Sequence, residues 1–335
     1  MVGETSPANG NQAQKQRRRK KWWRKAISRY PGYALGRILH AIASVIPHGA
    51  CGAISTIVGL AAYLFLVRDR RRAIDQLARV LGSERSPRDI RRLARAVFVH
   101  TASVYIEWSV LRRWSAERLE QRFPEAARDL RDLAVRVRAG GLGVVGLTGH
   151  LGNWELLSLF CSRFAPGLLV PIANRLYFRK YQEFLHRLRA ETGLRVIYND
   201  ESARKVVEAV RNGHLLGLLT DQEVRTNACV FVDLLGKPAQ TALFPVQLAR
   251  KLKARLTMVF LVREGSSYRV VDRGFFEVPH TSNVEADLLE ATQLWTRWLE
   301  EEILRRPEQW SWMHDRWHAR PDRPRRHVDR GRRIE

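Results

Sequence analysis

Cysteine is scarce in this chain of 335 residues, and its scarcity excludes two common kinds of framework. Only three cysteines occur, Cys51, Cys161 and Cys229, and they lie far apart. They form neither the paired spacing of a zinc site nor an even set for disulfides, which fits a reducing compartment. We therefore expect no metal centre, and we expect the three residues to pack as small apolar side chains in the core.

A serine nucleophile of the hydrolase type is also missing. No Gly-x-Ser-x-Gly sequence occurs anywhere in the chain. That motif places a reactive serine on a strand-to-helix turn, so an acyl-enzyme route of this type has no support.

The hydrophobic content is sufficient for a folded protein. Hydrophobic residues make up 45% of the chain, enough for a sizeable core, and this excludes a disordered basic protein.

Acidic residues are few for the number of bases. Against 58 Lys and Arg stand 34 Asp and Glu, a net charge of +24. Residues 1–40 carry +9 and residues 316–335 carry +5, so the ends are the most densely basic parts. Such a protein attracts anions, which leaves nucleic acid, an anionic membrane, an acidic carrier or a phosphorylated substrate as partners.

The N-terminal 67 residues indicate contact with a membrane. Residues 1–30 form a basic tail, expected to be disordered, in which the Lys15–Lys25 run contains Trp22 and Trp23. Tryptophan favours the headgroup level and basic side chains favour anionic lipid. No signal peptide is evident, because the basic start is long and lacks a small-residue cleavage site. Residues 31–67 follow as a predominantly apolar segment, expected to associate with the membrane.

No hydrophobic run in this segment is clearly long enough to cross a bilayer. Ala34–Ile46 is interrupted by charge, and Ala50–Val67 is eighteen residues without charge, near the roughly 20 that a span needs. Both flanks are strongly basic, and cytoplasmic flanks attract Lys and Arg. We therefore favour a hairpin or partly inserted helix pair turning at Pro47, on the cytoplasmic face of the inner membrane. The alternative is a helix pair buried in the globular core.

The sequence pattern of residues 68–320 is typical of one α/β domain, and a basic tail follows over residues 321–335. Ser86-Pro87 starts a helical region, and from Gly141 onward short apolar runs alternate with helical patterns. Strands that are apolar throughout, separated by helices, indicate a mostly parallel twisted sheet covered on both faces. The expected strands are 142–147, 168–172, 194–198, 215–220, 256–262 and 268–278. The expected helices after the first strand are 154–163, 178–192, 201–211, 242–251 and 283–304.

The segment Thr148-Gly-His-Leu-Gly-Asn-Trp-Glu155 carries the most chemistry. A strand ending at Gly149 and a helix capped by Asn153 place His150 on a strand-to-helix turn. Glu155 falls in the first helical turn, where the helix dipole stabilises a carboxylate, and it could reach one imidazole nitrogen. The other nitrogen would then be free as a general base for a hydroxyl. A chance His-Glu pair with no function is the alternative.

Together with four further motifs, this segment resembles the lipid A biosynthesis acyltransferase family and its His-x4-Asp/Glu superfamily. The resemblance covers roughly residues 32–321. The motifs follow the same order: Pro171-Ile-Ala-Asn-Arg175, Leu188-Arg-Ala-Glu-Thr-Gly193, Thr220-Asp-Gln222 with Val230-Phe-Val-Asp-Leu-Leu-Gly236, and Pro307-Glu-Gln-Trp-Ser-Trp-Met-His-Asp-Arg-Trp317. One departure is Leu234-Leu235 where the family often has Phe-Phe, which puts the acyl-chain preference in question.

The resemblance implies a glycerol-3-phosphate acyltransferase-like fold and a membrane-associated enzyme. It would move a fatty acyl group from an acyl carrier protein or coenzyme A thioester to a glycolipid hydroxyl, with no cofactor. His150 would be the base and Glu155 its partner. Arg189 and Asp221 match residues that shape the family's site, and Asn174 and Arg175 are further substrate-binding candidates. Asp221 also follows a buried strand, where α/β folds place ligand contacts.

Other functions remain open from the sequence alone. Within the same chemistry, the acceptor could be a phosphatidylinositol mannoside or another lysolipid. From a different class, the charge and the tryptophan-containing N-terminal arm would allow a basic nucleic-acid-binding protein. No recognised nucleic-acid-binding motif appears, and an uncharged stretch of eighteen residues would not contribute to binding DNA. We therefore expect no nucleic acid partner. The sequence indicates no oligomeric state.

Overall fold

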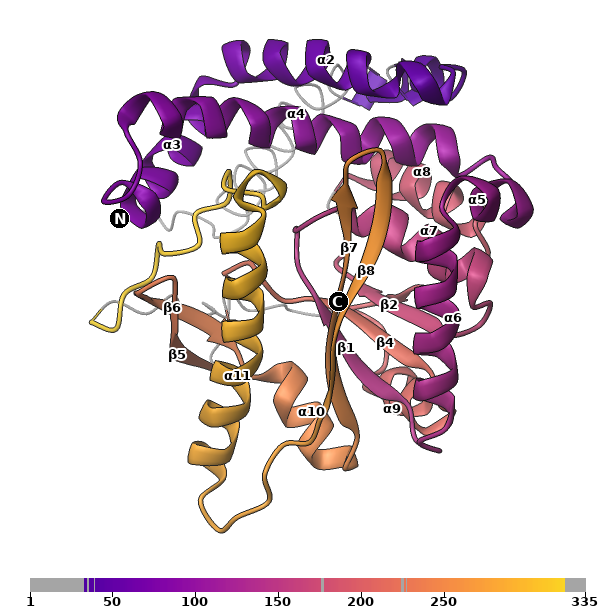
Figure 1. Cartoon of the computed structure of the whole chain (residues 1–335). Coiled ribbons are helices and arrows are strands. Elements are labelled where there is room, and N and C mark those ends of the chain that lie inside the picture. The colour runs from indigo at the N-terminus through magenta and orange to yellow at the C-terminus, as the bar shows by residue number, and fades with distance from the viewer. Residues whose placement is uncertain are drawn as a thin grey trace, which may run out of the picture.

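A six-stranded sheet forms the centre of the molecule (Figure 1). The computed structural model describes residues 33–34, 36–38, 40–175, 178–223, 226 and 228–322. The predicted tail over residues 1–30, with Trp22 and Trp23, lies outside the described residues, as does most of the predicted basic tail at the other end.

The sheet has the order β3-β2-β4-β1-β7-β8, and every neighbouring pair is parallel except β7 and β8. Helices cover both of its faces (Figure 1). This confirms the α/β prediction, because strands buried on both faces need the continuous apolar runs seen in the sequence. The strands are β1 Val144–Thr148, β2 Leu169–Ala173, β3 Ile197–Tyr198, β4 Leu215–Leu219, β7 Arg255–Glu264 and β8 Ser267–Phe276. The helices between and after them are α7 Trp154–Phe164, α8 Arg179–Ala190, α9 Ala203–Arg211, α10 Phe244–Leu252 and α11 Val284–Arg305.

The strand order places the loops that follow β1 and β4, which carry two of the family motifs, side by side. Strands β1 and β4 are neighbours, and the last residue of β1, Thr148, is in register with Leu219, the last residue of β4. Residues that follow these strands therefore meet at one edge of the sheet, where parallel α/β sheets bind ligands. His150 follows β1 and Asp221 follows β4.

A two-stranded hairpin lies outside the main sheet and was not expected from the sequence. It consists of β5 Cys229–Leu234 and β6 Lys237–Ala242, paired antiparallel. Strand β6 has no continuous apolar run, and Asp233 interrupts the run in β5. Leu235 and Gly236 make the turn with positive φ angles of 56° and 71°, as a tight two-residue hairpin requires.

The first helices of the chain, over residues 51–111, lie together at one side of the molecule (Figure 1). Helix α4 (Pro87–Leu111), capped by Ser86 as predicted, carries α2 (Cys51–Phe65) along its outer side. Glycine allows this close approach, because a Cβ on Gly59 would lie 2.4 Å from the Cα of Val99. The remaining helices of this part are η1 His48–Ala50, α3 Val67–Leu81, α5 Ala116–Arg122 and α6 Pro124–Arg138, and residues 33–34, 36–38 and 40–43 are also helical.

The apolar segment predicted to contact a membrane is only partly covered by protein. Within the described residues, one helical stretch, His48–Phe65, is long and apolar enough to cross a membrane, and 22% of it is buried. Cys51, Ser55, Gly59 and Tyr63 are its buried residues in α2, one every four positions, so a single face packs on α4. The alternative of a helix pair buried in the core does not describe α2. By itself such a helix is weak support for a membrane.

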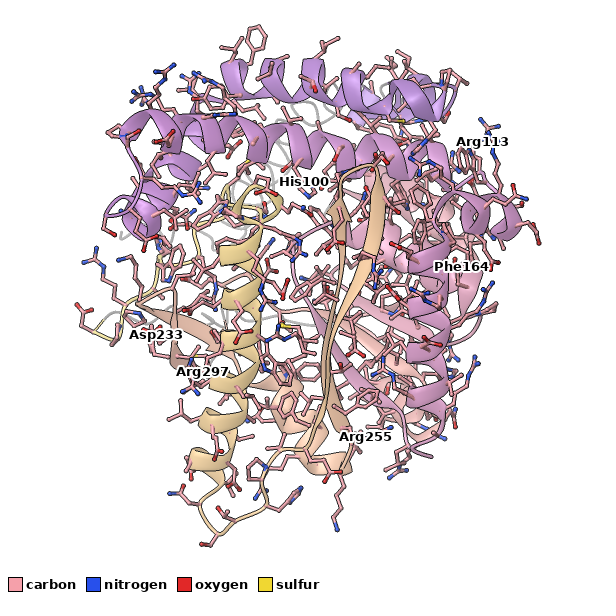
Figure 2. All side chains as sticks on the ribbon, in the orientation of Figure 1. His100, Arg113, Phe164, Asp233, Arg255 and Arg297 are labelled. Atoms are coloured by element: carbon pink, nitrogen blue, oxygen red, sulfur yellow. The ribbon has the colours of Figure 1, made fainter. Side chains whose placement is uncertain are left out.

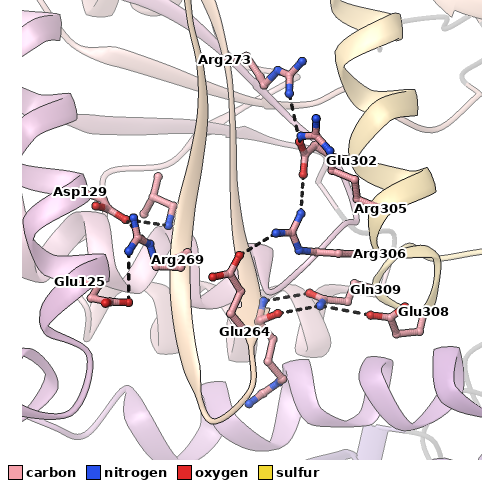
Figure 3. Close-up of polar contacts among 12 residues, drawn as sticks. Glu125, Asp129, Glu264, Arg269, Arg273, Glu302, Arg305, Arg306, Glu308 and Gln309 are labelled. Carbon is pink, nitrogen blue, oxygen red and sulfur yellow. Dashed lines mark hydrogen bonds and ion pairs between the residues drawn. The ribbon is translucent and has the colours of Figure 1, made fainter.

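The chain after α11 is tied back to the sheet by polar contacts (Figure 3). The fully buried carboxylate of Glu302 pairs with Arg273 of β8 and with Arg305 and Arg306. Next, Gln309 of η2 (Pro307–Gln309) donates its side-chain amide to the Arg263 carbonyl and accepts from the Arg263 N–H. These contacts hold the C-terminal motif beside β7, close to the turn that follows β1.

Candidate active site

The turn between β1 and α7 is built as the sequence predicted. Asn153 caps α7, with its side-chain oxygen accepting from the Leu156 N–H at 3.0 Å. Gly152 has a positive φ of 66°, and a Cβ there would lie 2.2 Å from the Leu261 carbonyl oxygen. A Cβ on Gly149 would lie 3.0 Å from the Cβ of Asp221. Both glycines are thus needed because the turn runs against β7 on one side and Asp221 on the other.

Asp221 is the carboxylate that holds His150. Its Oδ1 lies 2.9 Å from Nδ1 of the imidazole, and its Oδ2 accepts the His150 backbone N–H at 2.8 Å. The prediction that Glu155 makes this contact is wrong. Glu155 lies on the first turn of α7 and pairs with Arg189 of α8, with 3.3 Å between Oε1 and the guanidinium. The sheet order overrides the sequence spacing, since β4 delivers Asp221 directly beside His150.

Asp221 and His150 each stabilise the charged form of the other. Burial alone would raise the pKa of Asp221, but the positive charge of His150 and the hydrogen bonds from His150 and Trp310 lower it to about 2. Burial would lower the pKa of His150, but the charge and hydrogen bond of Asp221, together with the charge of Glu155, raise it above its ordinary value. An ionised Asp221 accepts the proton of Nδ1, which leaves Nε2 with a lone pair as a proton acceptor. The His150 side chain is 20% exposed, so it is not sealed within the core.

An apolar cavity lies near this pair. Trp154 lines it, and the Trp154 ring lies 4.9 Å from the ring of His150, while neither His150 nor Asp221 is among the described residues of the cavity wall. The cavity is partly open to solvent. Glu155 and Arg189 both line it, so the structure brings these two predicted site residues together. Leucines, valines and isoleucines of the sheet, α7 and the chain after α8 form most of the remaining wall, among them Leu147, Leu157, Leu169, Ile172, Leu194, Val196, Leu215 and Val259.

Asn174 and Arg175 follow β2 at the same edge of the sheet but face elsewhere. Both are exposed, and among the described residues the cavity wall includes Ala173 but neither of them. The Arg175 guanidinium pairs with Asp200 at 2.7 Å and lies over the ring of Tyr198, which draws it toward the edge strand β3. Their predicted binding of substrate therefore gains no support from the geometry.

The Leu234-Leu235 pair does not line the cavity either. Leu234 is fully buried in the main core, and Leu235 sits at the hairpin turn, where its N–H donates to Glu300 of α11 at 2.7 Å. Among the described residues of the cavity wall, neither leucine is present. Their substitution for phenylalanines thus bears on the packing of the hairpin and not directly on the cavity.

Sequence reasoning missed the contribution of the C-terminal motif to the site. The indole N–H of Trp310 donates to Asp221 Oδ2 at 2.9 Å, and the Ser311 N–H donates to the His150 carbonyl at 3.0 Å. Trp310, Trp312 and Trp317 are buried. The motif was visible in the sequence, but nothing in its spacing shows that it returns to a turn 160 residues earlier.

Two more side chains contact His150, and a third supports its turn. His100 of α4 (labelled in Figure 2) places Nε2 2.9 Å from the Gly152 carbonyl oxygen, and burial lowers its pKa to about 4, so it is a neutral donor. The ring of His314 lies 5.4 Å from that of His150, and burial with the charge of His150 lowers the pKa of His314. The side-chain nitrogen of Gln222 lies 2.9 Å from Nδ1 of His150 and 3.2 Å from its Nε2.

No group of three or more His, Cys, Asp or Glu side chains in the described part of the chain could hold a metal ion. Cys51 and Cys161 are buried as predicted, whereas Cys229 is half-buried. The site therefore consists of an imidazole oriented by a buried carboxylate at the edge of an apolar cavity. This arrangement can deprotonate a hydroxyl next to a bound hydrocarbon chain.

Comparison with known proteins agrees with this geometry. A family model described as bacterial lipid A biosynthesis acyltransferase matches residues 20–319. A search of curated proteins gives no match to the chain. The family match spans the turn after β1, the loop after β4 and the C-terminal motif, which are the three segments that meet at His150.

Proposed function

The chain belongs to the bacterial lipid A biosynthesis acyltransferase family, and we propose that it transfers a fatty acyl chain from a thioester to a glycolipid hydroxyl with His150 as general base. Family membership makes it an acyltransferase of lipid A biosynthesis, and not the nucleic-acid-binding protein that its charge alone would have allowed. The acyl donor, the mechanism and the membrane contact are part of the proposal.

The observation that carries the mechanism is the His150–Asp221 pair. Nδ1 is bound to a carboxylate only 2% exposed, so Nε2 is the nitrogen that can take a proton. In the proposed reaction the acceptor hydroxyl loses its proton to Nε2 as its oxygen bonds to the thioester carbon. The carbon–sulfur bond then breaks, and the leaving thiolate takes the proton from the imidazolium. His150 ends as it began, and we propose that no cofactor takes part.

Glu155 and Arg189 also have roles in the proposed reaction, although neither orients the imidazole directly. The charge of Glu155 contributes to the raised pKa of His150, so it favours proton uptake. Its ion pair with Arg189 forms a polar end to the otherwise apolar cavity. We propose that the hydrocarbon chain of the donor occupies the cavity, since burial of each CH₂ contributes about 0.8 kcal/mol.

The proposed donor is a thioester of an acidic acyl carrier protein or of coenzyme A. Both are anionic, and a chain of net charge +24 attracts either one. For the acceptor we propose a lipid A precursor, which agrees with the family. A phosphatidylinositol mannoside or another lysolipid is the second candidate, supported only by the shared chemistry of a lipid-borne hydroxyl.

We propose that the outer face of α2 contacts the inner membrane from the cytoplasmic side. Ile57, Leu64 and Phe65 are exposed apolar residues of this helix, Phe65 to 82%. The exposed arginines that follow could contact anionic headgroups, and none forms an ion pair with a described carboxylate: Arg68, Arg71, Arg72, Arg79, Arg85, Arg88, Arg91, Arg92 and Arg95. An apolar helix face bordered by arginine is typical of helices that lie in a membrane interface.

Direct assay of the purified full chain tests this proposal. Vesicles containing an under-acylated lipid A precursor are incubated with acyl carrier protein thioesters or with acyl-coenzyme A thioesters, and the lipids are analysed by mass spectrometry. We expect a mass gain of one acyl group on the precursor. A parallel incubation with a lysophospholipid measures the second candidate. No mass gain on any glycolipid or lysolipid with either donor would refute the proposed function.

A further inference from the structure

Gln222 lies against His150 but takes no part in the proposed proton transfer. It directly follows Asp221 after β4. Among the described residues, its hydrogen-bond-range contacts are with the two ring nitrogens of His150, at 2.9 and 3.2 Å. A role as a simple cap of the turn has no supporting contact among the described residues. The amide nitrogen, and not the amide oxygen, is the atom that approaches the ring.

The two distances decide how the amide meets the imidazole. Nδ1 and Nε2 are both bonded to the carbon between them, so an atom in the ring plane and near both would overlap that carbon. The amide nitrogen therefore lies over the face of the ring. Nδ1 is also engaged in the plane by Asp221 at 2.9 Å. Gln222 thus does not donate along the lone pair of Nε2, and its N–H groups remain available beside that nitrogen.

Beside Nε2 is where the reaction creates negative charge. The attacking oxygen must lie within hydrogen-bond distance of Nε2, and the thioester carbonyl oxygen lies two bonds from that oxygen once the new bond forms. A donor 3.2 Å from Nε2 is close enough to reach it. Side-chain amides stabilise such oxyanions, and removing one typically costs about 10²–10³ in kcat. Arg189, the nearest described cation of the cavity wall, is engaged by Glu155.

We infer that Gln222 is a catalytic residue whose side-chain N–H donates to the oxyanion of the tetrahedral intermediate. This inference rests on the proposed function. The acceptor oxygen bonds to the thioester carbon as its proton passes to Nε2. The π electron pair of the carbonyl moves onto the carbonyl oxygen, and the Gln222 N–H donates a hydrogen bond to this oxyanion. When that pair re-forms the double bond, the carbon–sulfur bond breaks, and the thiolate takes the proton held by the imidazolium.

The test compares wild type with Gln222→Met, which keeps the length of the side chain and removes its donor. We expect kcat to fall by about 10²–10³ with KM nearly unchanged. The acid limb of the pH–kcat profile should stay in place, because the charge and orientation of His150 still come from Asp221. Gln222→Asn, with a donor one bond shorter, should recover part of the rate. Gln293→Met is the control, since within the described part of the chain Gln293 bonds to the backbone of Asp233 in the hairpin and to nothing else.

Each outcome separates the possible failures. Full activity of Gln222→Met beside an active wild type would overturn the role of Gln222 and leave the proposed function standing. A loss of kcat with a displaced acid limb would also overturn it, because Gln222 would then act by positioning His150. Absence of transfer by wild type would refute the proposed function, and the role of Gln222 with it. Thermal unfolding of each variant checks that the protein remains folded.

Discussion

Asp221 holds His150 at two points, the backbone N–H at 2.8 Å and Nδ1 at 2.9 Å. The first contact fixes the position of the residue, and the second fixes its tautomer. Because the carboxylate also accepts from the Trp310 indole at 2.9 Å, it is itself immobilised. A base whose orientation is set in advance loses little freedom when substrate binds, which is one source of catalytic rate.

Replacing His150 by alanine should remove most of the transfer activity and leave folding intact. The imidazole is the only proton acceptor that the proposed mechanism uses, and loss of one general base typically costs about 10²–10⁴ in rate. Acyl transfer to the lipid A precursor is the measurement. His318→Ala is a matched control, because His318 is exposed and, among the described residues, bonds to Asp315 alone. Transfer by His150→Ala at the wild-type rate would contradict the assignment.

The pH dependence should identify Asp221 as the partner of the base. His150 must be neutral to accept a proton, and its pKa is raised, so wild-type kcat should fall as the pH drops through a value above 6.5. Asp221→Asn removes the charge that raises this pKa, so the acid limb should move to lower pH. In addition, kcat should drop on the order of 10⁴, as for a triad that loses its tautomer control.

The control for this profile is Asp132→Asn, which changes an exposed aspartate of α6. It should reproduce the wild-type profile. If Asp221→Asn kept the wild-type acid limb while Glu155→Gln displaced it strongly, Glu155 would be the partner of the imidazole in solution.

Gly152→Ala should destabilise the protein because of the turn it occupies. A positive φ of 66° strains any other residue by about 1–3 kcal/mol, and the new Cβ would lie 2.2 Å from the Leu261 carbonyl oxygen. We expect a lower midpoint of thermal unfolding and reduced transfer. Gly49→Ala serves for comparison, since a Cβ at Gly49 meets nothing within 4 Å. Equal midpoints for the two variants would show that the turn is not constrained in this way.

A side chain at Gly217 should shorten the acyl chain that the cavity accepts. Gly217 lines the cavity from β4, and a Cβ there would meet the flexible end of Leu169 at 2.9 Å. Gly217→Val should therefore favour shorter donors, by about fourfold in kcat/KM for each CH₂ that no longer fits, at roughly 0.8 kcal/mol each. Competition between donors of different length measures this. Val135→Leu, on the exposed side of α6, should leave the preference unchanged.

Charge on the outer face of α2 should weaken membrane binding. Leu64→Glu and Phe65→Glu place carboxylates on the exposed apolar face, where burial in lipid is costly and anionic headgroups repel them. Sedimentation with vesicles of mixed neutral and anionic phospholipid should show less bound protein than wild type. Val135→Glu, on an equally exposed apolar residue of α6, should bind as wild type does. Equal binding by all variants would place the membrane contact elsewhere.

The sequence by itself determined the elements and the location of the chemistry. Apolar runs located the strands of the main sheet within a few residues, because a sheet covered on both faces needs them. The glycines and the Asn153 cap located the turn that carries His150, since these are local requirements of backbone geometry. Strands β5 and β6 were not predicted, because Lys237–Ala242 has no such run and Asp233 interrupts the run in β5.

Tertiary structure alone decided which groups meet at the site. Glu155 is five residues from His150 and Asp221 is seventy-one, yet the pairing of β1 with β4 brings Asp221 to the imidazole, while the direction of α7 turns Glu155 toward Arg189. Trp310 reaches Asp221 because the chain after α11 is tied back to β7. Strand order and chain return depend on the packing of the whole core, and no local pattern in the sequence encodes them.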